Sequence, residues 1–234
     1  MTTAAAAHST SYRDDILARG YCIVKGLFPK DLLQACREDI LAFKAKEHLI
    51  ANEGGYTIPD FIQWPALVRV AELRNYPSLL SILQNNIFDG KPFRFCAHND
   101  IGINRIVGWH KDRLNGAYSK YQTTPIWSKQ GEEQHEIMKV LIYLEDHPGG
   151  KDGLTVVPAS HLRQDMGGTE AAISIESELG DVVIFDQRIT HRGMARQVAE
   201  SRILVSFGFG KENVFTDEFE RGTVARQKDQ NLTR

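Results

Sequence analysis

The sequence predicts one α+β domain that is mainly β, with helices at its start and an antiparallel β-structure after them. Two observations support this order. Up to about Lys91, apolar residues recur at helical spacing between turn residues. Beyond it, short strand-like runs follow each other closely, separated by turn signals such as "HPGGKDG" and "ELGD", which favours a sandwich or barrel. No Ser-, Gly- or Pro-rich linker divides the 234 residues, so we expect a single domain over 1–234.

The N-terminal part predicts a tail, two helices and a strand. Residues 1–11 contain mostly Ala, Thr and Ser and predict a poorly ordered tail. "YRDDILAR" (12–19) predicts a short helix that ends at Gly20, and "YCIVKGLF" (21–28) predicts a strand. A second helix is expected after Pro29, because its apolar residues recur every three or four positions and share one face: Leu33, Cys36, Ile40 and Phe43.

The stretch 48–65 contains two glycines and two prolines and predicts a long loop, which a third helix around 76–88 follows. The later strand-like runs predict the sheets, where we expect the N-terminal helices to pack. In chain order these runs read "PFRFCA", "IMKVLIYL", "LTVVP", "GDVVIF" and "RILVSFGFG".

Composition excludes several classes of partner. The formal net charge of −2 and the isoelectric point near 6.5 indicate neither a nucleic-acid surface nor attraction to an anionic membrane, and no run approaches the ~18 apolar residues of a membrane span. Three widely spaced cysteines without a C-x-x-C pair favour a reducing compartment, and the N-terminal residues lack a secretory signal pattern. We therefore expect a cytoplasmic protein with a small-molecule partner, without nucleic acid or membrane; the residues do not indicate its oligomeric state.

Two His-x-Asp triplets stand out among the eight histidines: His98 with Asp100, and His110 with Asp112. A histidine and a carboxylate two residues apart can point to one place where a strand runs into a loop. A single triplet is weak evidence, because most histidines in a protein of this size are structural. A third ligand is therefore needed to indicate a metal site.

His191 is the best third ligand. It follows "GDVVIFDQRIT", where a turn leads into an apolar strand that delivers the histidine at its end. His161, in "VVPASH", is the rival, but the polar "LRQD" after it favours a surface turn and a structural role. Two imidazoles and one carboxylate on one octahedral face leave three positions open, the arrangement of non-haem Fe(II) oxygenases.

Arg202 lies eleven residues after His191, at the start of "RILVSFGFG". In a strand, Arg202, Leu204 and Ser206 share one face. A buried arginine is costly without an anionic partner, and its planar guanidinium suits a carboxylate, which it binds through two hydrogen bonds. An arginine on an edge strand that reaches out to water is the alternative interpretation.

The order of these motifs resembles the phytanoyl-CoA dioxygenase family of Fe(II)- and 2-oxoglutarate-dependent oxygenases. The resemblance implies a double-stranded β-helix core, a cupin-like jelly roll, with the N-terminal helices packed on one sheet. It spans most of the chain, and the matching segments are "ARGYCIVKGLFPKDLL", "GWHKD", "YLED", "GLTVVPASH", "GDVVIFDQRITHRG" and "ESRILVSFGFG".

The resemblance also implies roles for single residues. A tryptophan precedes the family's metal ligands, which selects His110 and Asp112 as iron ligands, with His191 as the third. Arg202 takes the position that binds the distal carboxylate of 2-oxoglutarate. The chain departs from the usual Pro-Gly-Ser-His loop at Ala159. Three further residues are expected as cofactor contacts: Ser206, Lys139 and Asn104.

The expected reaction is hydroxylation of an unactivated C–H bond of a small molecule, with Fe(II), 2-oxoglutarate and O₂ and with release of succinate and CO₂. Asp112 disfavours halogenation, because halogenating relatives have Gly or Ala there. Desaturation or cyclisation, an iron enzyme acting without 2-oxoglutarate, and a non-catalytic jelly-roll binding protein remain alternatives. The sequence shows no evident general base, which disfavours a zinc hydrolase, and no basic patch, which disfavours a nucleic-acid repair oxygenase.

The long segment "RLNGAYSKYQTTPIWSKQGEEQ" after the metal motif is expected to cover the active site, because loops of this length are uncommon unless functional. Its aromatic residues could equally pack the loop onto the barrel. We expect substrate contacts from this region, although nothing indicates that the substrate is a CoA thioester. The expected contacts are Trp109, Arg113, Tyr118 and Trp127, and Tyr121 lies near them.

Overall fold

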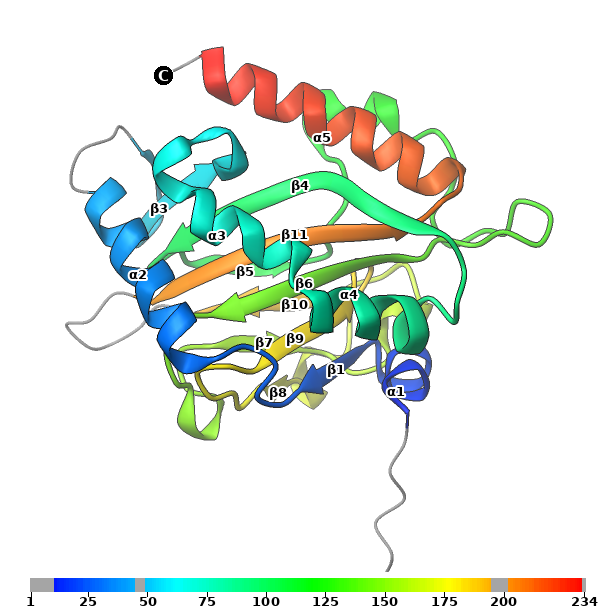
Figure 1. The fold of residues 1–234 in the computed structure, drawn as a ribbon. Helices are drawn as coiled ribbons and strands as arrows, with labels where there is room; N and C mark the ends of the chain where they lie inside the picture. Colours follow the sequence, from blue (N-terminus) through cyan, green and yellow to red (C-terminus); the bar gives the residue numbers. More distant parts are fainter. Residues whose placement is uncertain (1–10, 45–48, 195–201, 233–234) are drawn as a thin grey trace, which may run out of the picture.

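Two antiparallel sheets that share a core form the centre of the protein in a computed structural model (Figure 1). The structure describes residues 11–44, 49–194 and 202–232, so nearly all of the tail predicted over 1–11 lies outside the described residues. Every pair of neighbouring strands is antiparallel. This arrangement is a jelly roll, which confirms the predicted fold class.

The two sheets differ in size. In spatial order the larger one consists of β1 (Tyr21–Val24), β9 (Val182–Asp186), β6 (Ile137–Tyr143), β11 (Ile203–Lys211), β4 (Phe93–Ile103), β3 (Gly55–Pro59) and β2 (Ile50–Asn52). The smaller one consists of β5 (Val107–His110), β10 (His191–Gly193), β7 (Leu154–Val156) and β8 (Ile173–Ser174).

Most of the α-helices precede β4 in the chain. Of these, α2 (Lys30–Lys44), α3 (Val68–Glu72) and α4 (Pro77–Ile82) lie across the outer face of the larger sheet (Figure 1). The α-helices are α1 (Tyr12–Arg19), α2 (Lys30–Lys44), α3 (Val68–Glu72), α4 (Pro77–Ile82) and α5 (Val214–Leu232). One π-helical turn covers Leu83–Ile87, and short 3-10 turns cover Phe61–Gln63, Pro65–Leu67, Leu73–Asn75, Gly116–Tyr121, Pro148–Gly150, Ser160–Leu162 and Thr169–Ala171.

The first two helices form as the sequence predicts. Ser11 caps α1 by accepting from the Asp14 backbone, and Gly20 ends the helix in a left-handed conformation with φ of 85°. The predicted apolar face of α2 is buried in the core between the helices and the larger sheet. It consists of Leu33, Cys36, Ile40 and Phe43. Burial of this face stabilises α2 more than its helix propensity does.

Alternation along β11 sends its side chains to two different places. Ile203, Val205 and Phe207 enter the core under the helices, whereas Leu204 and Ser206 face the space between the two sheets. The predicted strand and its two faces are therefore correct. The second core, between the sheets, is smaller and contains residues such as Leu141 and Val156.

The stretch 48–65 was predicted as a loop, and this prediction is wrong for its middle part. Residues there form the hairpin of β2 and β3, which adds to the edge of the larger sheet beside β4. Gly54 makes the turn with φ of 74°, and a Cβ on Gly55 would collide with the Ile103 carbonyl oxygen. The glycines thus mark a tight hairpin that lies close against the neighbouring strand.

The sequence did not predict α5, which lies beside β4 (Figure 1). Its buried residues mix apolar and polar types, Phe215 and Phe219 with Thr223 and Gln227 among them, so the apolar pattern along it is weak. None of the described helices combines the length and the apolar character that crossing a bilayer requires.

Candidate metal centre and cavity

His110 and His191 lie opposite each other on two neighbouring short strands. His110 is the last residue of β5 and His191 the first of β10, and the two are cross-strand partners. Their ring centroids are 4.1 Å apart. A register shift of one residue would turn one imidazole to the other face of the sheet, so the strand pairing itself brings the two rings together.

Asp112 completes the group from the loop after β5. Its backbone N–H donates to the Gln187 carbonyl at 3.0 Å, which ties this loop to the segment leading into β10. Its Oδ1 lies 3.3 Å from His110 Nε2 and 3.9 Å from His191 Nε2. One ligand atom from each of the three side chains lies within 4.8 Å of the others, a spacing that can hold one metal ion.

Backbone carbonyls fix the orientation of both imidazoles. His110 Nδ1 lies 2.8 Å from the Gly108 carbonyl oxygen, and His191 Nδ1 lies 3.0 Å from that of Ile189. Only a protonated Nδ1 can donate to a carbonyl, so the lone pair of each neutral ring is on Nε2, the atom that faces Asp112. This donor set fits a divalent transition metal.

Lys139 on β6 holds the other oxygen of the carboxylate. Its Nζ lies 3.5 Å from Asp112 Oδ2, while Oδ1 faces the imidazoles. Burial raises the pKa of Asp112, but the charge of Lys139, the electrostatic interaction with His191 and the hydrogen bond from His110 outweigh burial and hold this pKa well below its usual range. The carboxylate is therefore anionic, as a ligand must be.

The two imidazoles differ in their electrostatics. Burial lowers the pKa of His191 to about 4, so its ring is neutral at pH 7. Burial also lowers the pKa of His110, but its hydrogen bond and charge interaction with Asp112 outweigh burial, and the net shift is upward. A bound cation would replace the proton shared between His110 and Asp112.

A cavity of about 460 Å³ lies between the sheets beside these three side chains. It has two ends. We call one the Arg202 end, and it is lined by Arg105, Val107, Tyr143, Leu154, Gly193, Arg202 and Leu204. We call the other the α5 end, and it is lined by His98, Asp100, Arg113, Leu114, Tyr118, Phe219, Thr223 and Arg226.

Arg202 lies within the cavity wall, 4% exposed. Its guanidinium donates to the carbonyl of Asp152 at 2.9 Å and to those of Met194 and Arg105, and its Nε has no partner among the described residues. A Cβ on Gly193 would lie 3.6 Å from this guanidinium. Gly193 is two residues beyond His191 in β10, so the strand position that faces the guanidinium lies roughly 7 Å along the backbone from that of His191.

Asn104 holds the backbone of Arg202. Its side-chain oxygen accepts from the Arg202 N–H at 2.6 Å, and its own N–H donates to the Arg202 carbonyl at 2.9 Å. Asn104 has φ of 53°, a left-handed conformation that asparagine adopts more readily than most residues. It is outside the cavity lining, so its contact is with the arginine.

Tyr143 is a cavity residue that the sequence reasoning missed. It pairs with Leu204 across β6 and β11 and lies in the Arg202 end. Burial raises the pKa of its phenol to about 12, against the opposing effect of the Arg202 charge, so the phenol remains a hydrogen-bond donor. The signal was present in "YLED", where Tyr143 shares the strand face of the strand residue Lys139.

Ser206 belongs to the middle of the cavity wall. Its hydroxyl lies 3.1 Å from His98 Nε2, and it is four residues along β11 from Arg202. One position on the same strand face, that of Leu204, therefore separates Ser206 from Arg202.

At the α5 end, Arg226 binds Asp100 through two nitrogens at 3.1 Å. Coulombic attraction and hydrogen bonds from Arg226 outweigh the effect of burial and lower the pKa of Asp100 to about 2. Arg226 belongs to the helix that the sequence did not predict, so this pair was not foreseen. Both side chains of the first His-x-Asp triplet are thus engaged within the protein.

The predicted substrate residues divide into two groups. Arg113 and Tyr118 line the cavity, whereas Trp109 and Trp127 are outside its lining. The Trp109 ring lies under the Arg192 guanidinium at 4.6 Å. Trp127 Nε1 donates to the His161 carbonyl at 3.0 Å, and Tyr121 packs in a small cluster with Leu114 and Phe219.

Lys111, between the two ligands of the metal motif, is buried and has no carboxylate partner within the part of the chain that the structure describes. Its Nζ donates to the carbonyls of Ser160 at 2.6 Å and Arg188 at 2.8 Å, and it ties three loops together. Burial lowers its pKa to about 8. His161 itself belongs neither to the triad nor to the cavity lining, and its Nε2 lies 3.2 Å from the Leu17 carbonyl oxygen.

A scan of family models finds no match to this sequence, and a search of curated proteins finds none either. Solved structures do match. SnoN, a "non-heme alpha ketoglutarate dependent epimerase" of nogalamycin biosynthesis, is 16% identical over 85% of this chain and 80% of its own, with a TM-score of 0.66.

Two further matches have similar values. The "carbocyclase SnoK" from the same biosynthesis is 19% identical over 86% of this chain and 83% of its own, with a TM-score of 0.64. HygX from Streptomyces hygroscopicus, solved with nickel and 2-oxoglutarate bound, is 16% identical over 86% of this chain and 87% of its own, with a TM-score of 0.62. At these identities the similarity shows a common fold, that of non-haem iron, 2-oxoglutarate-dependent enzymes.

Proposed function

We propose that this protein is an Fe(II)- and 2-oxoglutarate-dependent oxygenase of the phytanoyl-CoA dioxygenase type, acting as one domain in the cytoplasm on a small molecule. The observation that carries the proposal is the joint placement of two kinds of group in one cavity. His110, Asp112 and His191 converge there, and the buried Arg202, which precedes β11 of the other sheet, faces Gly193 two residues beyond His191.

The three converging side chains would hold Fe(II). Both imidazoles present Nε2 because their Nδ1 atoms are committed to carbonyls, and Asp112 offers Oδ1 because Lys139 engages Oδ2. This arrangement favours one oxygen of the carboxylate as ligand, so the three side chains would offer three ligand atoms to such an ion. The bound ion would then supply binding of 2-oxoglutarate and activation of O₂.

The Arg202 end would take the distal carboxylate of 2-oxoglutarate. The roughly 7 Å step along β10 from His191 to the position that faces the guanidinium suits a five-carbon dicarboxylate whose other end chelates the metal. Tyr143 lies beside Arg202 and can donate a second hydrogen bond to the same carboxylate. Asn104 would act by holding the backbone of Arg202. Of the other two expected 2-oxoglutarate contacts, Lys139 lies at the metal ligand Asp112 and Ser206 lies in the middle of the cavity wall.

Bound Fe(II) and 2-oxoglutarate would supply the oxidation itself, by activating O₂ while 2-oxoglutarate is converted to succinate and CO₂. The protein's residues bind and orient. Lys139 and the carbonyls of Gly108 and Ile189 fix the ligand atoms, and Arg202 aligns the co-substrate. The apolar side chains of Leu154 and Leu204 limit the entry of water at the Arg202 end.

Hydroxylation is the reaction we propose, because Asp112 occupies the position that halogenation needs open. The structural neighbours include an epimerase and a carbocyclase, so a related oxidation such as cyclisation is the second candidate. Neighbours solved with nogalamycin RO and with hygromycin B support a small-molecule substrate. An iron enzyme without 2-oxoglutarate, or a non-catalytic jelly roll, would leave the buried Arg202 without an anionic partner.

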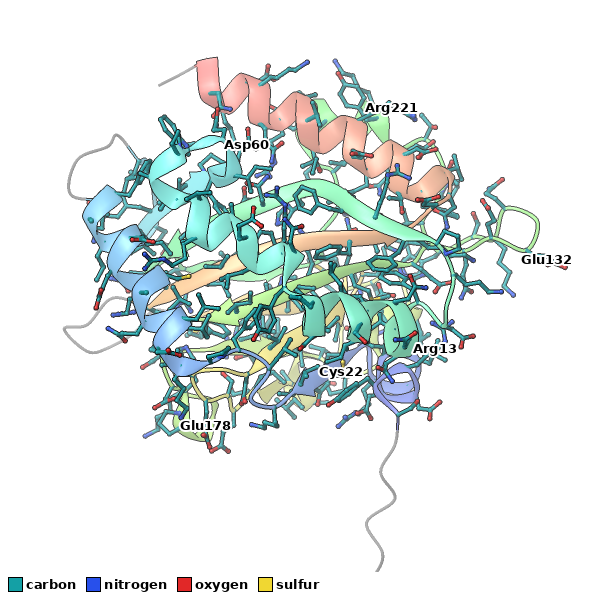
Figure 2. The ribbon with its side chains drawn as sticks, in the orientation of Figure 1. Arg13, Cys22, Asp60, Glu132, Glu178 and Arg221 are labelled. Atoms are coloured by element: carbon teal, nitrogen blue, oxygen red, sulfur yellow. The ribbon has the colours of Figure 1, made fainter. Side chains whose placement is uncertain are left out.

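Anaerobic titration of the Fe(II)-loaded protein with 2-oxoglutarate tests the proposal. We expect the weak visible charge-transfer band of a chelated iron–2-oxoglutarate complex, and Fe(II)-dependent succinate formation when O₂ is admitted. Arg221→Gln is the matched control, because Arg221 is an exposed arginine of α5 outside the cavity (Figure 2). Absence of the band in protein that binds Fe(II) would refute the 2-oxoglutarate assignment.

A further inference from the structure

The α5 end of the cavity is distinct from the part assigned to 2-oxoglutarate. Arg202, Tyr143 and Leu204 lie along the strands on one side of the metal ligands. On the other side, α5 supplies Phe219, Thr223 and Arg226. The segment after Asp112 adds Arg113, Leu114 and Tyr118. A substrate placed beside the metal while 2-oxoglutarate occupies the Arg202 end would therefore contact the α5 end.

The charge of the cavity contrasts with that of the whole protein. The formal net charge of the chain is −2, yet the cavity lining holds two carboxylates, Asp100 and Asp112, and six cationic side chains. These cations are Arg105, Lys111, Arg113, Lys139, Arg202 and Arg226. A concave, low-dielectric site of one sign focuses the field on ligands of the opposite sign.

Most of these cations have a partner in the protein. Arg226 is bound by Asp100, Lys139 by Asp112, and both Lys111 and Arg202 by backbone carbonyls. The remaining two, Arg105 and Arg113, make neither a hydrogen bond nor an ion pair through their side chains within the described part of the chain.

The proposed cofactors do not neutralise this excess. The chelating carboxylate of 2-oxoglutarate and Asp112 offset the charge of Fe(II), and the distal carboxylate offsets Arg202. The Asp112 carboxylate that pairs with Lys139 would also bind the metal. Arg105 lies toward the Arg202 end, where its carbonyl accepts from that guanidinium. Of the two cations that are unpaired within the described residues, Arg113 is the one that lies next to the space left for substrate.

The α5 end also offers apolar surface next to Arg113. Leu114, the next residue, packs with Phe219 in a buried cluster, and a Cβ on Gly222 of α5 would collide with Leu114. Tyr118 closes this end by donating to Asp229 of α5 at 2.9 Å. The lining thus combines an apolar floor with a cationic rim.

We propose that the substrate of this site is an anionic small molecule, a carboxylate with an apolar body, whose charged group binds Arg113 at the α5 end. The inference rests on the proposed function, since it assumes that 2-oxoglutarate fills the Arg202 end. Arg113 orients the acid group, and the apolar body extends over Leu114 and Phe219 toward the metal. An exposed guanidinium next to an apolar pocket suits this ligand class.

Calorimetric titration of the full-length protein, loaded anaerobically with Fe(II) and saturating 2-oxoglutarate, tests the inference. The probes are monocarboxylates of increasing apolar length, such as phenylacetate, each with its primary amide and its amine. We expect the carboxylates to bind about tenfold more tightly than the amides, the size of one charge-assisted hydrogen-bonded contact. Arg113→Gln should remove this preference, Arg113→Glu should shift it to the amine, and Arg221→Gln should keep it.

Equal binding of carboxylate and amide, no carboxylate binding across the panel, or a preference that survives Arg113→Gln would each overturn the inference. The visible iron–2-oxoglutarate band, recorded first in the same samples, reports separately on the proposed function. Where that band is absent, the probes are titrated into metal-free Arg202→Gln protein, with and without Arg113→Gln. A loss of carboxylate preference that depends on Arg113 there would support the anion site without the oxygenase.

Discussion

The two His-x-Asp triplets have the same spacing and opposite surroundings. His98 and Asp100 lie inside β4, in the middle of the larger sheet, where both side chains face the cavity. His110 ends β5, an edge strand of the smaller sheet, and Asp112 lies in the loop beyond it. Spacing alone would make these triplets equal candidates for a metal site.

The difference is in what already occupies the ligand atoms. His98 Nε2 lies 3.1 Å from Ser206 Oγ, and Arg226 binds both oxygens of Asp100. In the other triplet, Nδ1 of His110 is engaged while Nε2 faces Asp112 and a second imidazole. A triplet thus becomes a metal-ligand candidate when its neighbours orient the side chains without consuming their lone pairs.

Replacing the aspartate of each triplet by alanine should produce the largest difference in metal binding and turnover between the two triplets. We predict that Asp112→Ala lowers Fe(II) affinity and 2-oxoglutarate turnover by more than about 100-fold, because a ligand is lost and not merely a supporting contact. Asp100→Ala should keep metal binding. Metal titration and succinate release measure both. Full Fe(II)-dependent succinate production in Asp112→Ala would remove Asp112 from the ligand set.

The two buried arginines form the next contrast. Among the described residues the Arg202 guanidinium meets only carbonyls, whereas Arg226 meets a carboxylate. We predict that Arg202→Ala raises the KM for 2-oxoglutarate about 10- to 100-fold with a smaller change in kcat, since a contact made in the ground state is lost. Arg226→Met should leave this KM within a few-fold. Steady-state kinetics on both variants decide, and an unchanged KM in Arg202→Ala would contradict the assignment.

Arg226→Met should instead affect stability. It leaves the Asp100 carboxylate, whose side chain is 10% exposed, without its partner. Because the guanidinium is itself partly exposed, we expect a loss of about 1–3 kcal/mol, less than for a fully buried pair. Urea unfolding measures it, and the Asp100→Asn/Arg226→Met double variant should recover part of the loss. No change in the midpoint would show that the pair does not stabilise the fold.

The histidines of the two triplets should respond differently to pH. Burial lowers the pKa of His98 to about 3, so between about pH 6.5 and 3 the unfolded chain binds a proton that the folded one does not. Stability must therefore fall as pH falls through this range, by up to about 1.4 kcal/mol per pH unit for this group. His98→Gln in metal-free protein should flatten the dependence measured by urea unfolding, and an unaltered slope would contradict the prediction.

Asn104→Ala should have the smallest effect. The variant removes the oxygen that accepts from the Arg202 N–H but leaves the guanidinium in place. We expect a few-fold rise in the KM for 2-oxoglutarate with kcat unchanged, below the effect of Arg202→Ala. A rise as large as that of Arg202→Ala would mean that Asn104 touches the co-substrate itself.

The parts of the site that the sequence could indicate are those with local periodicity. The spacing of His110 and Asp112, and the alternation that puts Leu204 and Ser206 on one face, follow from strand geometry alone. His191 was identifiable because an apolar strand leads to it. The convergence of these residues in the structure matches that reasoning.

The rest depends on contacts between distant elements, which leave no periodic signal. Arg226 meets Asp100 from a helix whose buried face is partly polar, so neither the helix nor the pair was visible. Tyr143 was part of a quoted motif, but its place in the cavity depends on the register of β6 with β11. Trp109 precedes the metal motif, yet its ring stacks on Arg192 outside the cavity.

One consequence follows from the shortness of β5 and β10. The two histidines sit on strands of four and three residues, and β5 has a neighbour on one side only. An ion bound by both imidazoles would cross-link the two strands. Its binding free energy would stabilise this edge of the smaller sheet against local unfolding. Metal loading should then slow amide hydrogen exchange in β5 even when no 2-oxoglutarate is present.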